Sequence, residues 1–217
     1  MGSEMCIRDR SRTGILTPFR RRKLQILDAK GVKTCEVSTL DVSNEDQAFE
    51  LINMAAELSP SGVGGVFHLA VVLCDCLFEN QTAKRFKTVL SPKSTGALNM
   101  DKALRKLSKV NPSMSTTLFV VFSSATSGLG NAGQTNYAYA NSSMERLCEL
   151  RNQDNLHSLA IQWGAIAEVG ILHTIMGGKD IESISLNQSI LVCPALIPFS
   201  ARIRSVPLLA VMFQLCN

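Results

Sequence analysis

Helical and extended patterns of apolar residues alternate along the chain. Apolar residues spaced three and four positions apart predict helices, and short apolar runs bounded by turn residues predict buried strands. The helical pattern covers residues 17–30, 44–58, about 92–107 and 134–151. The extended pattern covers residues 32–40, 65–70, 118–122 and 158–163.

This alternation predicts an α/β fold, a doubly wound parallel sheet with helices on both faces. The run LFVVF at residues 118–122 has the continuous apolar character of a strand buried on both faces. In such sheets ligands bind at the carboxyl ends of the strands. Residues that directly follow the predicted strands are therefore the first candidates for chemistry.

Composition narrows the class of protein. The 217 residues suffice for one domain, and 46% hydrophobic against 18% charged residues excludes a disordered chain. A net charge of +4 is too small to indicate nucleic-acid binding. The charge is uneven, because residues 183–217 contain no acid and only two bases, Arg202 and Arg204. Composition thus indicates one apolar globular domain with an unusual C-terminal segment.

The seven cysteines and the charged N-terminus predict a cytoplasmic protein. An odd number of scattered cysteines is not typical of a disulfide framework, and no apolar run at the N-terminus predicts a signal peptide. Cys74 and Cys76 are interpreted as small loop fillers, since no second Cys or His pair stands at zinc spacing, and no metal is predicted. Prolines and arginines interrupt the apolar C-terminal segment, so no membrane span is predicted.

A glycine motif leaves two interpretations open. Gly128, Gly130 and Gly133 match G-x-G-x-x-G between a predicted strand and a predicted helix, as in dinucleotide-binding turns. Residues 123–127 separate the strand from the first glycine, whereas a phosphate turn begins at the strand's end. The spacing favours a role other than phosphate binding.

A serine and a tyrosine form the most informative constellation. Ser124 ends the strongest predicted strand, and Tyr137 follows thirteen residues later on the next predicted helix. Asn141 lies four residues after Tyr137 and therefore on the same helix face. Taken alone, each residue could have a structural role, in packing, in a turn or on the surface. Their joint spacing favours a site.

This spacing resembles the short-chain dehydrogenase/reductase superfamily. The usual lysine four residues after the tyrosine is replaced here by Asn141, as in ketoreductase domains of animal fatty acid synthases and modular polyketide synthases. The resemblance is closest to the fatty acid synthase β-ketoacyl reductase and extends from Ser11 to Met176. It rests on SRTG, DVSN, GGVFHLAVVLCDCLFENQTAKRF, SPKSTGALNMD, FVVFSSATSGLGNAGQTNYAYANSSMERLCE and IQWGAIAEVGIL.

The resemblance implies a catalytic group and a cofactor, NADPH. It places the catalytic roles on Lys93, Ser124, Tyr137 and Asn141. Tyr137 would protonate the forming alkoxide, Ser124 would hydrogen-bond it, and a Lys93 ammonium would lower the pKa of the tyrosine. The residues implied in NADPH binding are Ser11, Arg12, Asp41, Val42, Leu69, Ala70, Lys93 and Tyr137.

Both ends of the chain depart from the family pattern. We expect residues 1–10 to be an unrelated leader, residues 11–176 a partial ketoreductase domain, and residues 177–217 a divergent apolar tail. The first strand and the glycine-rich loop of the family precede the Ser-Arg pair, and residues 1–10 do not read as that strand. We therefore expect an incomplete sheet that lacks a central strand, and weak NADPH binding by the isolated chain.

Three functional hypotheses follow from the resemblance. The first is reduction of 3-oxoacyl chains within a fatty acid synthase, on an acyl carrier protein whose phosphopantetheine holds the substrate. The FENQT and QWGAI stretches favour it. The alternatives are a polyketide synthase ketoreductase and a non-catalytic fragment with an incomplete cofactor site. In each case the partners would be other synthase domains, with neither nucleic acid nor membrane.

Overall fold

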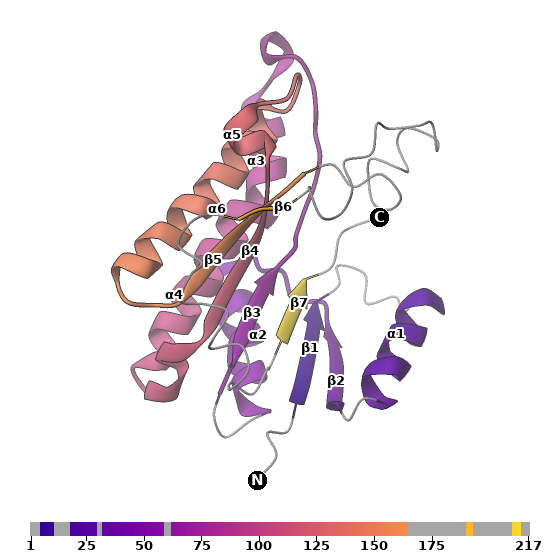
Figure 1. The fold of residues 1–217 in the computed structure, drawn as a ribbon, viewed down its shortest axis with the longest axis vertical. Helices are drawn as coiled ribbons and strands as arrows, with labels where there is room; N and C mark the ends of the chain where they lie inside the picture. Colours follow the sequence, from indigo (N-terminus) through magenta and orange to yellow (C-terminus); the bar gives the residue numbers. More distant parts are fainter. Residues whose placement is uncertain are drawn as a thin grey trace.

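The chain folds around one seven-stranded sheet. The computed structural model describes residues 5–10, 18–29, 32–58, 62–164, 190–192 and 210–213. The strand order is β2-β1-β7-β3-β4-β5-β6 (Figure 1). The strands are β1 (Met5–Arg10), β2 (Val32–Ser38), β3 (Gly65–His68), β4 (Leu118–Ser124), β5 (Ser158–Trp163), β6 (Ile190–Val192) and β7 (Ala210–Phe213).

The sheet is parallel except at one edge. β1 pairs in parallel with β2 and β7, β3 with β7 and β4, and β4 with β5. β6 pairs antiparallel with β5 at the edge. The predicted Rossmann-like α/β fold is confirmed. The carboxyl ends of all the parallel strands lie along one border of the sheet. We call this border the ligand-binding edge, because ligands bind there in this class of sheet.

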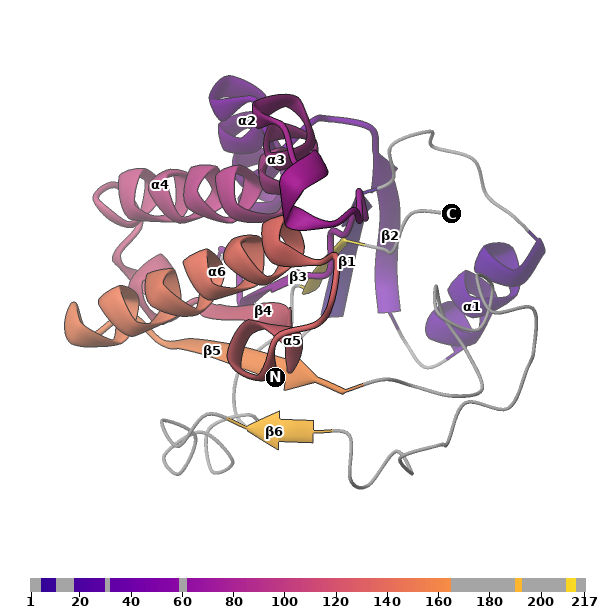
Figure 2. The same cartoon turned by 90° about the horizontal axis from the view of Figure 1, so that it is seen from above.

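Helices alternate with the strands along the chain and pack against the sheet. They are α1 (Pro18–Ala29), α2 (Glu45–Glu57), α3 (Ala83–Leu90), α4 (Gly96–Ser108), α5 (Thr126–Leu129) and α6 (Thr135–Gln153), with short turns at η1 (Phe78–Asn80), η2 (Ser91–Thr95) and η3 (Pro112–Thr116). Figure 2 shows α2, α3, α4 and α6 gathered on one face, with α1 apart from them beside β2. In the described part of the chain, no helix is both long and apolar enough to cross a membrane.

The start of α2 shows why a predicted helix begins where it does. Asn44 caps the helix, and its side-chain oxygen accepts a hydrogen bond from the Gln47 backbone N–H at 3.1 Å. Glu45 and Asp46 place negative charge in the first turn, where it stabilises the positive end of the helix dipole. The structure thus confirms the helix predicted over residues 44–58 to within its caps.

The core lies between the sheet and the helices on its main face. Leu51 and Ile52 of α2, Val66 of β3, Met100 of α4 and Phe119 of β4 are all fully buried within it. Each buried side chain of this size stabilises the fold by about 1.5–3 kcal/mol. The helical pattern near residues 92–107 predicted an apolar position at Met100, which is buried, and another at Leu98, which is 44% exposed.

The two ends of the chain differ from our expectation. Residues Met5–Arg10 form a strand that pairs along its whole length with β2, although we expected no strand there. Residues Ala210–Phe213 form β7, which lies between β1 and β3 (yellow in Figure 1). The position that we expected to be missing from the middle of the sheet is therefore filled by a strand from the C-terminal segment. The domain boundaries at residues 10 and 176 stay predictions.

Gly96, the first residue of α4, allows the helix to approach the sheet closely. A Cβ atom at this position would lie 2.8 Å from Val42 Cγ2 and 3.6 Å from His68 Cε1. Val42 and His68 are both buried, so neither side chain can move aside freely. The glycine thereby lets one helix start contact both the loop after β2 and the end of β3.

We predict that Gly96→Val lowers the free energy of unfolding by roughly 1–3 kcal/mol, because it overpacks this contact. Chemical denaturation would measure the change. The matched control is Gly128→Val, since a Cβ atom at Gly128 meets nothing within 4 Å. Equal losses in the two variants would show that the contact with Val42 is not the cause.

Candidate active site

A π-helical turn places Lys93 inside the protein. The turn η2 (Ser91–Thr95) joins α3 to α4, and π segments of this kind are frequent at functional sites. The Lys93 side chain is 2% exposed, and its Nζ donates to the carbonyl oxygens of Ala70 and Phe122, each at 3.3 Å. The lysine amine therefore lies where β3 and β4 reach the ligand-binding edge.

Tyr137 and Asn141 of α6 lie beside this lysine. Lys93 Nζ stands 5.2 Å from the centroid of the Tyr137 ring. Asn141 is fully buried one turn later, and its Nδ2 donates to the Tyr137 carbonyl oxygen at 3.0 Å. Among the described residues, Asn141 Oδ1 has no hydrogen-bond partner. The structure thus brings together the lysine, the tyrosine and the asparagine that the sequence singled out.

Ser124 completes the group at the end of β4. The backbone N–H and the Oγ1 hydroxyl of Thr126 both donate to Ser124 Oγ, at 3.3 and 3.0 Å. With its oxygen occupied as an acceptor, Ser124 retains its own O–H to donate. Two hydroxyl donors, Ser124 and Tyr137, then stand together, and such a pair can stabilise negative charge on a carbonyl oxygen.

Burial sets the pKa values in this group. It raises the pKa of Tyr137, against the lowering effect of the Asn141 and Ser124 side chains, and the Asp75 carboxylate adds to the rise. Burial also lowers the pKa of Lys93 from 10.5 to about 7. We expected a Lys93 ammonium to lower the pKa of Tyr137. The structure differs, because desolvation disfavours the charged form of both side chains.

The loop after β3 closes one side of the site. The Cys76 backbone N–H donates to the Gly133 carbonyl oxygen at 2.9 Å, and Gln134 Nε2 donates to Asp75 Oδ2 at 2.8 Å. Asn136 Nδ2 donates to the Cys74 carbonyl oxygen at 2.8 Å. These bonds hold the loop against the start of α6. Gln134 and Asn136 were not predicted. In the sequence only their amide side chains, shortly before Tyr137, could have indicated them.

The glycine motif at residues 128–133 serves this contact. Helix α5 stands between β4 and Gly130, so the motif does not begin at the strand's end. Gly133 has φ +79°, and a Cβ atom there would meet the Cys76 backbone at 3.6 Å. The positive φ favours glycine at this position. The geometry supports the interpretation that this motif is a packing turn and not a phosphate turn.

The residues predicted for the adenosine end of a cofactor are brought together in part. Asn99 of α4 donates from Nδ2 to the carbonyl oxygens of Val42 and Ser43, at 3.0 and 3.1 Å. Leu69 and Ala70 directly follow β3. Buried Val42 and Ala70 beside the exposed Asp41 carboxylate fit a group with an apolar base and ribose hydroxyls. Ser11 and Arg12 lie outside the described residues, and Asn99 was not predicted.

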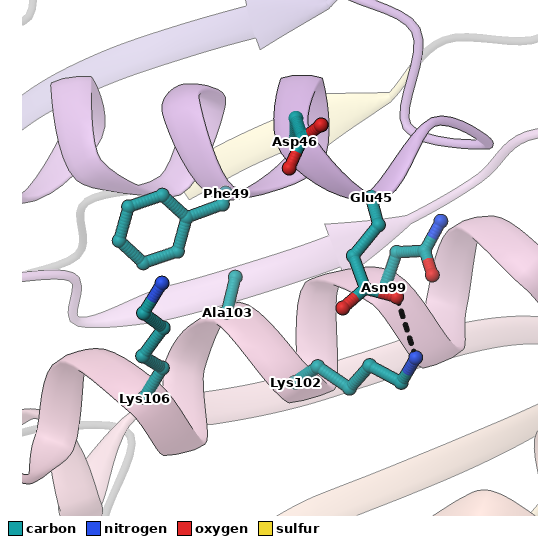
Figure 3. A pocket seen from close by; sticks show the side chains of 7 residues that line it. All are labelled: Glu45, Asp46, Phe49, Asn99, Lys102, Ala103 and Lys106. Atoms are coloured by element: carbon teal, nitrogen blue, oxygen red, sulfur yellow. Dashed lines mark hydrogen bonds and ion pairs between the residues drawn. The ribbon is translucent and has the colours of Figure 1, made fainter.

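A hollow lies between α2 and α4, away from the group around Tyr137 (Figure 3). None of the predicted site residues lines it. Lys102 Nζ pairs with Glu45 Oε2 at 2.6 Å, and Lys106 Nζ stands 4.2 Å from the centroid of the Phe49 ring. Lys102 and Glu45 thus pair with each other, and the residues that line the hollow are separate from the group around Tyr137.

His68 and the cysteines have structural environments. His68 is fully buried, and its Nε2 hydrogen-bonds the Lys93 carbonyl oxygen at 2.9 Å. Cys74 and Cys76 are free thiols of the loop after β3, and Arg85 Nη1 lies 3.5 Å from Cys74 Sγ. Within the described ranges, no group of three His, Cys, Asp or Glu side chains is placed to hold a metal ion.

Known proteins and one family profile resemble this chain in sequence. The sequence profile described as "KR domain" matches residues 6–168. The highly reducing polyketide synthase cm3B of Cordyceps militaris is 33% identical over 164 residues, which are 75% of this chain and 6% of that synthase. The chain therefore spans only a small part of the curated relatives that it matches.

Solved structures give the same result. The PlmKR1 ketoreductase from the first module of phoslactomycin biosynthesis in Streptomyces sp. HK803 is 28% identical, with a TM-score of 0.64 over 78% of this chain and 36% of that one. A structure described as A-type ketoreductases from modular polyketide synthase is 27% identical, with a TM-score of 0.64 over 77% of this chain and 34% of that one.

We predict that Lys93 gives the stability of the protein a distinct pH dependence. Between its folded pKa of about 7 and its model-peptide value of 10.5, the unfolded chain binds one more proton at this residue than the folded chain. The contribution of Lys93 to stability is therefore largest above the upper value and falls as the pH falls toward the lower one.

Calorimetric unfolding at about pH 8.5 should show that wild type takes up about one proton more than Lys93→Met does. The unfolding free energy of wild type should also rise more steeply with pH over this range. Identical proton uptake in the two proteins would contradict the assignment of a lowered pKa to Lys93.

Proposed function

Because the chain belongs to the KR domain family, whose profile it matches over residues 6–168, we propose that it is the ketoreductase of a polyketide synthase-like assembly. Its reaction would be the reduction of β-keto groups to hydroxyls. One observation carries the proposal, which is that Lys93, Ser124, Tyr137 and Asn141 gather at the ligand-binding edge of the sheet.

The relatives favour a polyketide synthase over an animal fatty acid synthase. We expected the fatty acid enzyme on the FENQT and QWGAI stretches. The curated relatives at 31–34% identity, which match 57–76% of the chain, include fungal polyketide synthases and the Streptomyces halstedii polyketide synthase GfsA. Both solved structures at 27–28% identity are ketoreductases, and one of them is described as coming from a modular polyketide synthase. We therefore propose a polyketide synthase ketoreductase, which the sequence had left as an alternative to the fatty acid enzyme.

The site residues divide the chemistry of carbonyl reduction between them. A nicotinamide dinucleotide, when bound, supplies a hydride to the carbonyl carbon. Ser124 donates a hydrogen bond to the carbonyl oxygen, and Tyr137 gives that oxygen its proton. The raised pKa of Tyr137 keeps its hydroxyl protonated, and thus able to donate, at neutral pH. Lys93 and Asn141 hold the tyrosine in place.

The cofactor we propose is NADPH. Asp41 and Val42 would hold the adenine, Leu69 and Ala70 would lie along its ribose, and Lys93 with Tyr137 would hold the ribose next to the nicotinamide. Support comes from the bonds that Asn99 makes to the carbonyl oxygens of Val42 and Ser43. Ser11 and Arg12 would select the 2′-phosphate, because a guanidinium binds phosphate through two parallel hydrogen bonds.

The substrate we propose is a 3-oxoacyl chain on the phosphopantetheine of an acyl carrier protein. This partner follows from the synthase relatives, in which a ketoreductase is one segment of a long multidomain chain. We propose that the assembly works in the cytoplasm and that other synthase domains are further partners.

We predict that Tyr137→Phe lowers kcat for reduction of a 3-oxoacyl thioester by about 10²–10⁴-fold, because it removes the general acid. Loss of NADPH absorbance at saturating cofactor would measure the rate. The matched control is Tyr139→Phe on the same helix, because Tyr139 is 57% exposed and should tolerate the loss of its hydroxyl.

An unchanged kcat in Tyr137→Phe would refute the assigned acid. A wild-type chain that neither turns over nor binds NADPH would instead favour the non-catalytic alternative. Our expectation of weak NADPH binding by this chain makes a direct titration the first measurement to perform.

We also predict that Arg12→Ala raises the KM for NADPH by about 10–100-fold and changes the KM for NADH less than threefold, because one charge-assisted phosphate pair is lost. Steady-state kinetics with both cofactors would measure the two values. Equal effects on NADPH and NADH would show that Arg12 does not read the 2′-phosphate.

A further inference from the structure

A carboxylate on α6 lies next to the turn that carries Ser124. Glu145 Oε1 accepts hydrogen bonds from the hydroxyls of Ser123 and Ser127, the second at 2.6 Å. Ser123 is the residue before Ser124 at the end of β4, and Ser127 lies in α5, which follows the turn. One side chain thus fixes the chain on both sides of Ser124.

The contact continues from Ser127 to the catalytic serine itself. Ser127 Oγ lies 2.7 Å from the Ser124 carbonyl oxygen, and Gln162 Nε2 of β5 donates to Ser127 Oγ at 3.0 Å. Gln162 occupies one side of the hydroxyl, so the single Ser127 proton is directed at either the Ser124 carbonyl or the Glu145 carboxylate. A carboxylate is the stronger acceptor of the two, so we assign the Ser127 proton to Glu145.

The position of Glu145 on the helix connects the two halves of the site. Tyr137, Asn141 and Glu145 follow at intervals of four residues, and they therefore share one face of α6. Tyr137 is the proposed proton donor and Asn141 lies beside it. Glu145 holds the end of β4 that carries Ser124. The separation between the Ser124 and Tyr137 hydroxyls consequently depends on the register of a single helix.

We propose that Glu145 is a positioning residue of the reductase, which acts through Ser123 and Ser127 to hold Ser124 against the substrate carbonyl. The inference rests on the proposed function and deepens it. Glu145 touches no reacting atom. A misplacement of a catalytic group by about 1 Å can cost about 10²-fold in rate, so the loss of this anchor should appear in kcat.

The experiment uses the full chain, saturating NADPH and a 3-oxoacyl thioester. Glu145→Ala should lower kcat by about 10-fold or more and leave the KM for NADPH within about twofold of wild type, because the cofactor residues are untouched. Glu145→Gln keeps an acceptor oxygen and should recover most of the rate. The control is Glu149→Ala, one turn further along, since Glu149 is paired with Arg146 on the surface at 2.7 Å.

A double-mutant cycle separates this role from a general loss of structure. If Glu145 acts through Ser127, adding Ser127→Ala to Glu145→Ala should lower kcat little further. The kcat of the double variant should therefore equal that of the less active single variant within about threefold. Multiplied losses would overturn the proposal, as would a kcat of Glu145→Ala within about twofold of wild type. Absence of reductase turnover in wild type would refute the proposed function instead, so the two failures are distinguishable.

Discussion

The burial of one amine organises this structure. Lys93 Nζ contacts two backbone carbonyl oxygens, that of Ala70 after β3 and that of Phe122 in β4, and so ties two neighbouring strands together at the ligand-binding edge. The same short segment makes further contacts with the sheet. Its Lys93 carbonyl oxygen meets His68, and Gly96 contacts Val42. Ala70 and Val42, both proposed for cofactor binding, are thus contacted from the same short segment that carries Lys93.

Burial of the Lys93 amine costs free energy, and this cost explains why its pKa is lowered. Burial lowers the pKa of Lys93 to about 7. Two carbonyl dipoles compensate only in part for the water that the ammonium has lost. A lysine that is easily neutralised beside a tyrosine that is hard to ionise suits a site that passes a proton. Strongly shifted pKa values of this kind gather at functional sites.

The sequence predicted what is local and missed what depends on distant partners. Periodicity located α2, α4, α6 and β3 to β5, and spacing placed Ser124, Tyr137 and Asn141 near one another. It could not reveal β7, because four residues from the C-terminal segment become a strand only by pairing with β1 and β3. Nor could it show that the pKa of Tyr137 rises, since burial depends on the packed structure. The contacts of Asn99, Gln134 and Glu145 were hidden for the same reason, because they cross between elements.

The geometry of the site finally depends on how α6 is fixed along its length. At its start, Gln134 and Asn136 bind the loop after β3. At its far end, buried Arg151 pairs with Asp101 of α4 and stands 4.7 Å from the centroid of the Phe119 ring. Removing one partner of such a buried pair costs about 3–5 kcal/mol, because the other charge stays buried. Since α4 directly follows the turn η2 that carries Lys93, this pair joins the helix of the tyrosine to the helix that begins at the end of that turn. The Arg151–Asp101 pair thereby helps to fix the position of Tyr137 relative to the turn that carries Lys93, the two side chains proposed for catalysis.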